Sequence, residues 1–246
     1  MPEPTAEPIL TATRVGKRFG ALRVLDDVSF TMHANEAVGI VGPNGAGKTT
    51  FLSVLVGALQ PGAGTVSFLG QDITHLPAAD RCRKGLVRTH QIPRPFLGMS
   101  VFENVFVASS NQTHANRDGA YADAIAALEL TGMLPIANRR GETLGLLDRK
   151  RLELARALAT GPKTLLLDEI GGGLSEGEAD ELVAIIKELR QRGIAIVWIE
   201  HIVHILLQVT DRLICMDAGK VIADGKPDAV MQDPAVIAAY LGGAAQ

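Results

Sequence analysis

The chain has 246 residues, with 24 Lys and Arg against 27 Asp and Glu, so its formal net charge is −3. This length suits one large domain with a sizeable buried core. A nucleic-acid partner is not expected, because proteins of that class carry a surplus of Lys and Arg to neutralise phosphates. The two cysteines, Cys82 and Cys215, lie far apart without metal-ligand spacing, so we expect both to stay reduced in a cytosolic compartment.

The N-terminal quarter has the composition of short strands. Segments rich in Val, Ile, Phe and Thr, separated by Gly, Asp and Asn, predict strands over 9–14, 24–33 and 37–41. The third segment is apolar throughout, as expected for a strand covered on both faces of a parallel sheet. It leads into a glycine-rich loop, after which 48–59 has a helical pattern and 62–70 resembles a return strand.

The central part of the chain is helical. Helical periodicity runs from 101 to 159, with alanine-rich amphipathic stretches at 122–130 and 149–158. Strand character returns at 164–167 and 194–199, and a helix is predicted over 178–192 between them. A helix followed by a parallel strand indicates βαβ crossovers.

The remaining segments complete a single predicted domain over 8–242. Residues 217–220 form a turn between two short strands, and a helical tail extends over about 226–242. No internal repeat is visible, so the helical region at about 92–155 is interpreted as a subdomain inserted into that domain.

The glycine-rich loop after the third strand carries a strong chemical signal. Its sequence matches G-x-x-x-x-G-K-[ST] between a buried strand and a helix, the context in which such a loop binds nucleotide phosphates. Backbone N–H groups close around phosphate oxygens, and the helix N-terminus adds positive potential. Lys48 would reach the β- and γ-phosphates, and the Thr49 hydroxyl would bind Mg²⁺. The residues predicted to bind ATP here are Gly42, Pro43, Asn44, Gly45, Ala46, Gly47, Lys48, Thr49 and Thr50.

Three polar residues follow two later strands. Asp168 and Glu169 end the apolar run 164–167, where Asp168 can face a metal ion and Glu169 an attacking water. His201 follows the strand 194–199 and should emerge at the same edge of the sheet, because ligands bind at the carboxyl ends of strands in open α/β sheets. Taken singly, these residues could be solvated acids and a structural histidine. Beside a phosphate loop they predict a hydrolytic centre.

In this order, the motifs resemble the ATP-binding subunits of ABC transporters, over nearly the whole chain from about 10 to 242. The resemblance implies an α/β fold of the P-loop NTPase type, with a mostly parallel core sheet, an N-terminal antiparallel β-subdomain and the helical insert. It also implies ATP and Mg²⁺ as ligands, and ATP hydrolysis coupled to transport without a covalent phosphoenzyme.

The same resemblance implies a role for each site residue. Phe19 would stack on adenine, and Gln91 would belong to the loop that joins the metal site to the helical insert. Glu169 would be the general base, and His201 would hold the γ-phosphate. The implied catalytic residues are Lys48, Glu169 and His201, and the implied metal ligands are Thr49, Gln91 and Asp168, the last mainly through water.

A narrower resemblance is to the branched-chain amino acid (Liv-type) importer ATPases. It is carried by 88–94, 152–158, 199–201 and the ending 233–242. It implies an importer of amino acids or related small solutes, with this chain on the cytoplasmic face of the inner membrane beside transmembrane permease subunits. A periplasmic solute-binding protein would contribute indirectly. This chain should not span the membrane itself, because its most apolar run is shorter than roughly 20 residues and is interrupted by polar ones.

The chain departs from the family where the L-S-G-G-Q signature lies. In the family, the serine hydroxyl and glycine amides of this motif contact the γ-phosphate held by the opposite subunit of a head-to-tail dimer. Here Gly145 stands in place of the serine, Leu147 stands in place of a glycine, and Asp148 adds a negative charge. Losing one charge-assisted hydrogen bond costs roughly 1.5–3 kcal/mol, or about 10- to 150-fold in rate. The altered signature reads Leu144, Gly145, Leu146, Leu147 and Asp148.

A second departure follows Glu169. Ile170 replaces the usual proline, and three glycines at 171–173 loosen the segment that should face the partner subunit. We favour pairing with a second, different ATPase whose intact signature completes the site. A homodimer with two weak sites is the alternative assembly. A soluble ABC ATPase without a transporter and a weakly hydrolysing regulatory subunit are the alternative functions.

Overall fold

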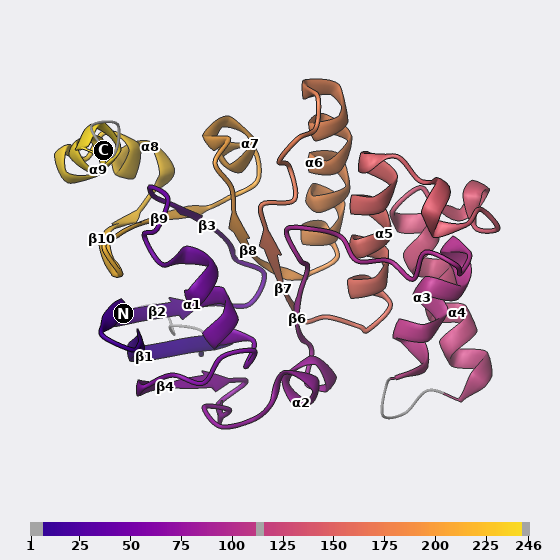
Figure 1. Ribbon diagram of the computed structural model, residues 1–246, viewed down its shortest axis with the longest axis horizontal. Helices are drawn as coiled ribbons and strands as arrows, with labels where there is room; N and C mark the ends of the chain where they lie inside the picture. Colours follow the sequence, from indigo (N-terminus) through magenta and orange to yellow (C-terminus); the bar gives the residue numbers. More distant parts are fainter. Residues whose placement is uncertain (1–6, 112–115, 243–246) are drawn as a thin grey trace, which may run out of the picture.

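The computed structural model describes residues 7–111 and 116–242 of the chain. Two sheets form one side of the molecule, and a group of helices forms the opposite end (Figure 1). This arrangement confirms the predicted fold class, with an antiparallel N-terminal sheet, a mostly parallel core sheet and a helical segment.

The N-terminal sheet is antiparallel and has the strand order β2-β1-β4-β5. Its first two strands are longer than predicted, because shifts in their pairing register allow the polar residues after Thr13 to stay in the sheet. Apolar side chains such as Leu10 and Phe30 are buried between this sheet and the rest of the core. The strands are β1 (Leu10–Phe19), β2 (Leu22–Met32), β4 (Ala63–Phe68) and β5 (Gln71–Asp72).

The core sheet has the order β10-β9-β3-β8-β7-β6, in which β10 alone is antiparallel to its neighbour. Every residue of β3, β7 and β8 is buried, as their apolar sequences predict. The three-residue strand β6 was not predicted, because so short a segment shows no periodicity. The strands are β3 (Ala37–Val41), β6 (Leu86–Arg88), β7 (Thr164–Asp168), β8 (Ala195–Ile199), β9 (Arg212–Asp217) and β10 (Lys220–Gly225).

The helices α3, α4 and α5 pack together at the end of the molecule away from β10 (Figure 1). Helix α3 begins with a capping box, in which the Ser100 hydroxyl accepts from the Glu103 N–H and the Glu103 carboxylate accepts from the Ser100 N–H. The helices are α1 (Lys48–Leu55), α2 (Ala78–Arg83), α3 (Val101–Ser110), α4 (Arg117–Leu130), α5 (Leu146–Leu158), α6 (Glu176–Gln191), α7 (Val203–Leu207), α8 (Pro227–Met231) and α9 (Pro234–Gly242). Part of the predicted helical insert, 112–115, lies outside the described residues.

Some predicted helix boundaries were wrong. Helix α1 ends four residues early, because Gly57 adopts a φ of 76° that ends the helical path. The tail contains two helices, since Pro234 starts a new one after α8. Helices α2 and α7 were missed. Within the described part of the chain, no helix has the length and apolar character needed to cross a membrane.

Candidate nucleotide site

The phosphate loop occupies residues 42–47, between β3 and α1. Its glycines Gly42, Gly45 and Gly47 have φ values of 140°, 80° and 98°, a region that side-chain-bearing residues rarely adopt. At Gly42 a Cβ atom would lie 2.0 Å from the carbonyl oxygen of Met216. The loop therefore requires glycine at its start, where β9 passes directly behind it.

Lys48 is folded over this loop. Its side chain is buried, and its ammonium group donates to the carbonyl oxygens of Gly42 at 2.7 Å and Pro43 at 3.0 Å. Burial lowers the pKa of Lys48, while the nearby Glu169 carboxylate opposes that shift. The ammonium thus borders a cleft of about 190 Å³. The cleft is lined by Val24, Asn44, Gly45, Ala46, Gly47, Lys48, Thr49, Thr50 and Glu169.

Glu169 is held between two side chains from different elements. Its carboxylate accepts a hydrogen bond from the Gln91 amide at 2.5 Å and pairs with Nε2 of His201 at 2.8 Å. Its φ of 49° is uncommon outside glycine, and such strain often marks functional sites. The structure thus brings three predicted site residues together at the carboxyl edge of the sheet.

Asp168 lies behind Glu169 and is buried. One carboxylate oxygen, Oδ2, lies 2.5 Å from Nη2 of Arg88, whereas no described group is within hydrogen-bond distance of Oδ1. A second cleft of about 240 Å³ adjoins it, and Thr49 lines both clefts. An unpaired buried carboxylate oxygen beside a threonine and a glutamine fits a hard cation such as Mg²⁺, which prefers oxygen ligands. The second cleft is lined by Thr49, Arg88, His90, Gln91, Ile92, Arg94 and Asp168.

Sequence reasoning assigned no site role to Arg88. It ends β6, which pairs in parallel with β7, so its side chain reaches the carboxyl edge where Asp168 lies. A second guanidinium nitrogen donates to the Ser53 hydroxyl of α1 at 2.8 Å. In the sequence, an arginine at the end of a strand could have indicated this role, but the three-residue strand β6 was too short to recognise.

Glu200, next to His201, was likewise not assigned a role. Its buried carboxylate accepts hydrogen bonds from the Gly171 N–H and from Nε1 of Trp198. Burial raises its pKa, and the buried ammonium of Lys150 partly opposes the shift. Glu200 therefore connects the strand end that carries His201 to the glycine segment after Glu169. An acidic residue continuing an apolar strand was the sequence signal.

Two sets of predicted residues lie apart from these clefts. Phe19 ends β1 with its ring about half exposed and the Lys17 ammonium 5.5 Å from the ring centroid. Residues 144–148 lead into α5, with Gly145 as its N-cap. Among the described residues lining the two clefts, neither Phe19 nor any member of 144–148 is present. Their roles in stacking on adenine and in contacting a partner's nucleotide stay predictions.

Residues 25–171 match the family model described as ABC transporter. The chain belongs to this family. Residues 220–246 of this ABC protein also match the model described as branched-chain amino acid ATP-binding cassette transporter. Membership identifies an ATP-binding ATPase subunit of a transporter complex that includes membrane permease subunits.

Curated relatives extend over nearly the entire ABC subunit. It is 35% identical over 252 residues to the high-affinity branched-chain amino acid transport ATP-binding proteins BraF of Pseudomonas aeruginosa and LivG of Escherichia coli K12. Each alignment covers 96% of this chain and 99% of the relative. It is also 36% identical over 234 residues to the lipopolysaccharide export system ATP-binding protein LptB of Haemophilus influenzae, covering 95% and 97%.

Solved structures agree with this family. A nucleotide-free ATP-binding cassette from an ABC transporter has a TM-score of 0.87 at 31% identity, covering 95% of this chain and 99% of the other. The ADP conformation of the cassette MJ1267 also has a TM-score of 0.87 at 31% identity, covering 96% and 100%. The ABC subunit therefore shares its fold with nucleotide-binding cassettes over 95–96% of its length.

Proposed function

We propose that this ABC subunit hydrolyses ATP to drive the uptake of amino acids or related small solutes. The single observation that carries the solute class is the match of 220–246 to the branched-chain amino acid cassette model. The names of BraF and LivG support it. LptB has a similar identity to this chain but belongs to an export system, so overall identity alone does not decide between uptake and export.

The geometry supports a specific division of labour during hydrolysis. ATP would place its phosphates in the cleft beside Lys48, whose ammonium stabilises charge on the transferring phosphoryl group. Glu169 would orient a water for in-line attack on the γ-phosphorus and accept its proton, while the bond to the bridging oxygen breaks. Gln91 and His201 keep that carboxylate at the edge of the cleft. His201 would also contact the γ-phosphate.

Thr49, Gln91 and Asp168 would hold Mg²⁺ between the two clefts, Asp168 mainly through water. When bound, this ion would neutralise charge on the β- and γ-phosphate oxygens. The unpaired Oδ1 of Asp168 supports this assignment. Phe19 would stack on the adenine at the outer side of the site, where its ring is exposed.

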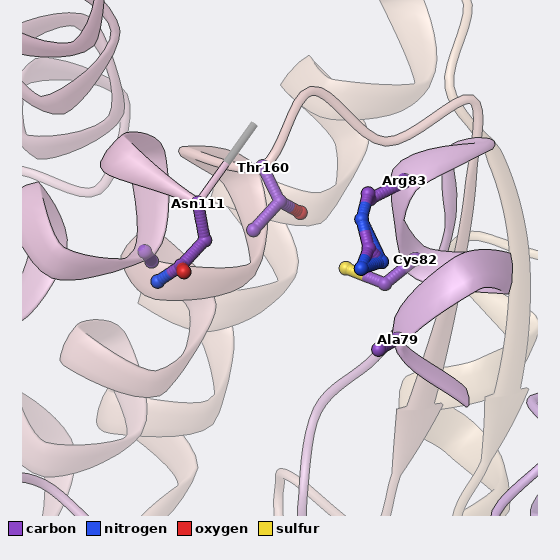
Figure 2. A pocket seen from close by; sticks show the side chains of 6 residues that line it. Ala79, Cys82, Arg83, Asn111 and Thr160 are labelled. Carbon is purple, nitrogen blue, oxygen red and sulfur yellow. The ribbon is translucent and has the colours of Figure 1, made fainter. Parts of the chain in front are cut away.

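The loop around 91–96 would contact the permease subunits. The large apolar side chains Ile92 and Phe96 of this loop are 68% and 47% exposed, and Leu97 next to it is 51% exposed. A hollow of about 210 Å³ lies between α2 and the ends of α3 and α5, as Figure 2 shows. Cys82 lines both this hollow and a neighbouring one that extends to His90. An apolar permease segment fits these two hollows and the exposed side chains beside them, because it would cover apolar groups that water otherwise surrounds.

A second, different ATPase would complete the hydrolytic site. Gly145 offers no hydroxyl at the start of α5, and Leu146 lies against the glycine segment, with its Cδ2 3.2 Å from where a Cβ of Gly173 would be. An intact signature from another chain would supply the missing donors. We further place the assembly on the cytoplasmic face of the inner membrane, served by a periplasmic solute-binding protein.

ATP turnover and solute uptake by the reconstituted transporter test this function. We expect uptake of an amino-acid-class solute that stops with Glu169→Gln, while ATP binding persists, because a positioned base contributes typically 10²–10⁴-fold. Turnover should rise when the second ATPase is added to this chain. Uptake that survives Glu169→Gln would overturn the proposed base, and vigorous turnover by this chain alone would overturn the need for a second ATPase.

A further inference from the structure

A side chain of the C-terminal helix α9 contacts the phosphate loop. The hydroxyl oxygen of Tyr240 accepts a hydrogen bond from the Gly42 N–H at 2.9 Å, although 198 positions separate the two residues. Helices α8 and α9 lie beside β9 and β10 (Figure 1), so the C-terminal segment reaches the end of β3 where the loop begins.

Gly42 is the residue at which several constraints on the loop meet. Its N–H is bound by Tyr240, its carbonyl oxygen accepts from the Lys48 ammonium at 2.7 Å, and the Met216 carbonyl lies directly behind its Cα. Losing the hydrogen bond to the Gly42 N–H therefore also affects the position of the Gly42 carbonyl, which binds Lys48. Lys48 depends on that peptide, because its buried ammonium requires acceptors.

The C-terminal part of the chain also braces the other end of the loop. The Gly219 N–H, between β9 and β10, donates to the Ala46 carbonyl at 3.1 Å, and the Gly219 carbonyl accepts from the Asp26 N–H at 2.8 Å. The loop is thus held in its phosphate-ready shape by segments distant in sequence. Tyr240 contributes a side-chain contact to the loop, whereas Gly219 contributes backbone contacts.

We propose that Tyr240 is a positioning residue for nucleotide binding, which fixes Gly42 and through it the Lys48 ammonium. The Gly42 backbone is buried, so losing the hydroxyl acceptor leaves a buried N–H unpaired. Partial burial raises the pKa of Tyr240, which is 39% exposed, and the phenol stays protonated at neutral pH. Because coupling is reciprocal, bound nucleotide should in turn strengthen the docking of α9.

Two matched tyrosine variants test this inference. Tyr240→Phe removes the hydroxyl and keeps the ring, whereas Tyr121→Phe removes the hydroxyl of the other tyrosine, which lies on α4. ADP binding is measured by calorimetry without Mg²⁺, and ATP turnover is measured as KM and kcat. We expect roughly three- to tenfold weaker ADP binding and a higher KM for Tyr240→Phe, with kcat little changed. Tyr121→Phe should bind ADP like the unaltered chain.

Hydrogen exchange provides a readout that general destabilisation does not move. The Gly42 amide should exchange faster in Tyr240→Phe while amides of β7 and α4 keep their rates, and ADP should slow exchange within α9 of the unaltered chain. Unchanged ADP affinity, or a loss confined to kcat, would overturn the inference. The inference rests on nucleotide binding by this loop, which ADP binding of the unaltered chain measures directly, and not on the transported solute.

Discussion

Arg88 and Asp168 form an ion pair at the carboxyl ends of β6 and β7, with Nη2 of the guanidinium 2.5 Å from Oδ2 of the carboxylate. Asp168 is almost fully buried, and this guanidinium is its ion-pair partner among the described residues, while the nearby Lys48 ammonium adds positive charge. The pair explains how the carboxylate is held in position in the absence of a metal ion, because a buried charge without a partner is costly.

Replacing Arg88 by Met should destabilise the chain by about 3 kcal/mol, since it leaves a buried carboxylate without its ion-pair partner. Urea unfolding without Mg²⁺ measures this loss. The deficit should shrink when Mg²⁺ and ADP are added, because the metal supplies positive charge at Asp168. Arg192→Met is the control, because Arg192 pairs with Glu188 at an exposed helix surface and its loss should cost less than about 1 kcal/mol. Equal losses in both variants would contradict the role of Arg88.

Restoring the signature should raise turnover if residues 144–148 limit hydrolysis. At Gly145 a Cβ would meet no atom within 4 Å, and the backbone is extended, so Gly145→Ser fits without strain. We expect Gly145→Ser with Leu147→Gly to increase ATP turnover about 10- to 150-fold, the value of one charge-assisted hydrogen bond. Gly145→Ser alone should change the free energy of unfolding by only a few tenths of a kcal/mol as a helix cap. Unchanged turnover would place the defect elsewhere.

Glu200→Gln should stabilise the chain increasingly as pH rises. Because burial raises the folded pKa of Glu200, its contribution to stability is greatest below the unfolded pKa and is lost as pH rises through the folded pKa. Glutamine is neutral at every pH, so the stability of the variant relative to the unaltered chain should be higher at pH 8 than at pH 4. Thermal unfolding across that range measures the difference.

Glu178→Gln is the opposite-sign control for this experiment. Hydrogen bonds from the Ser175 N–H and hydroxyl lower the pKa of Glu178, so its stabilising effect is present above the unfolded pKa and fades in acid. This variant should therefore be less stable than the unaltered chain at neutral pH, with the gap closing as pH falls. If both variants respond to pH in the same direction, burial is not what sets the pKa of Glu200.

The two cysteines should react at very different rates with a thiol reagent. Burial, reinforced by the Asp217 carboxylate, raises the pKa of Cys215 to about 11, so little thiolate exists at pH 8. Cys82 is only partly buried and lines a hollow next to α2. We expect one fast-reacting thiol per folded chain, and none after Cys82→Ser. Comparable labelling of both cysteines would show that Cys215 is accessible.

Much of the fold could be predicted because continuous apolar runs and long periodic helices carry their own signal. Strands β3, β7 and β8 are continuous apolar runs buried on both faces, and the strand rule placed Asp168, Glu169 and His201 at one edge. The segments β6, α2 and α7 were missed, because they are short and are not the continuous apolar runs that marked β3, β7 and β8.

The sequence by itself determined the phosphate loop. Its glycines, Lys48 and Thr49 act through backbone conformations and spacings that are local, so adjacent residues suffice to specify them. The tertiary structure alone decided what holds that chemistry in place. Three hydrogen bonds do this, and they join residues that are 198, 80 and 29 positions apart in the chain. They are the contacts of Tyr240 with Gly42, of Arg88 with Asp168 and of Glu200 with Gly171. Such pairs depend on how the strands are ordered in the sheet, and no local pattern encodes that order.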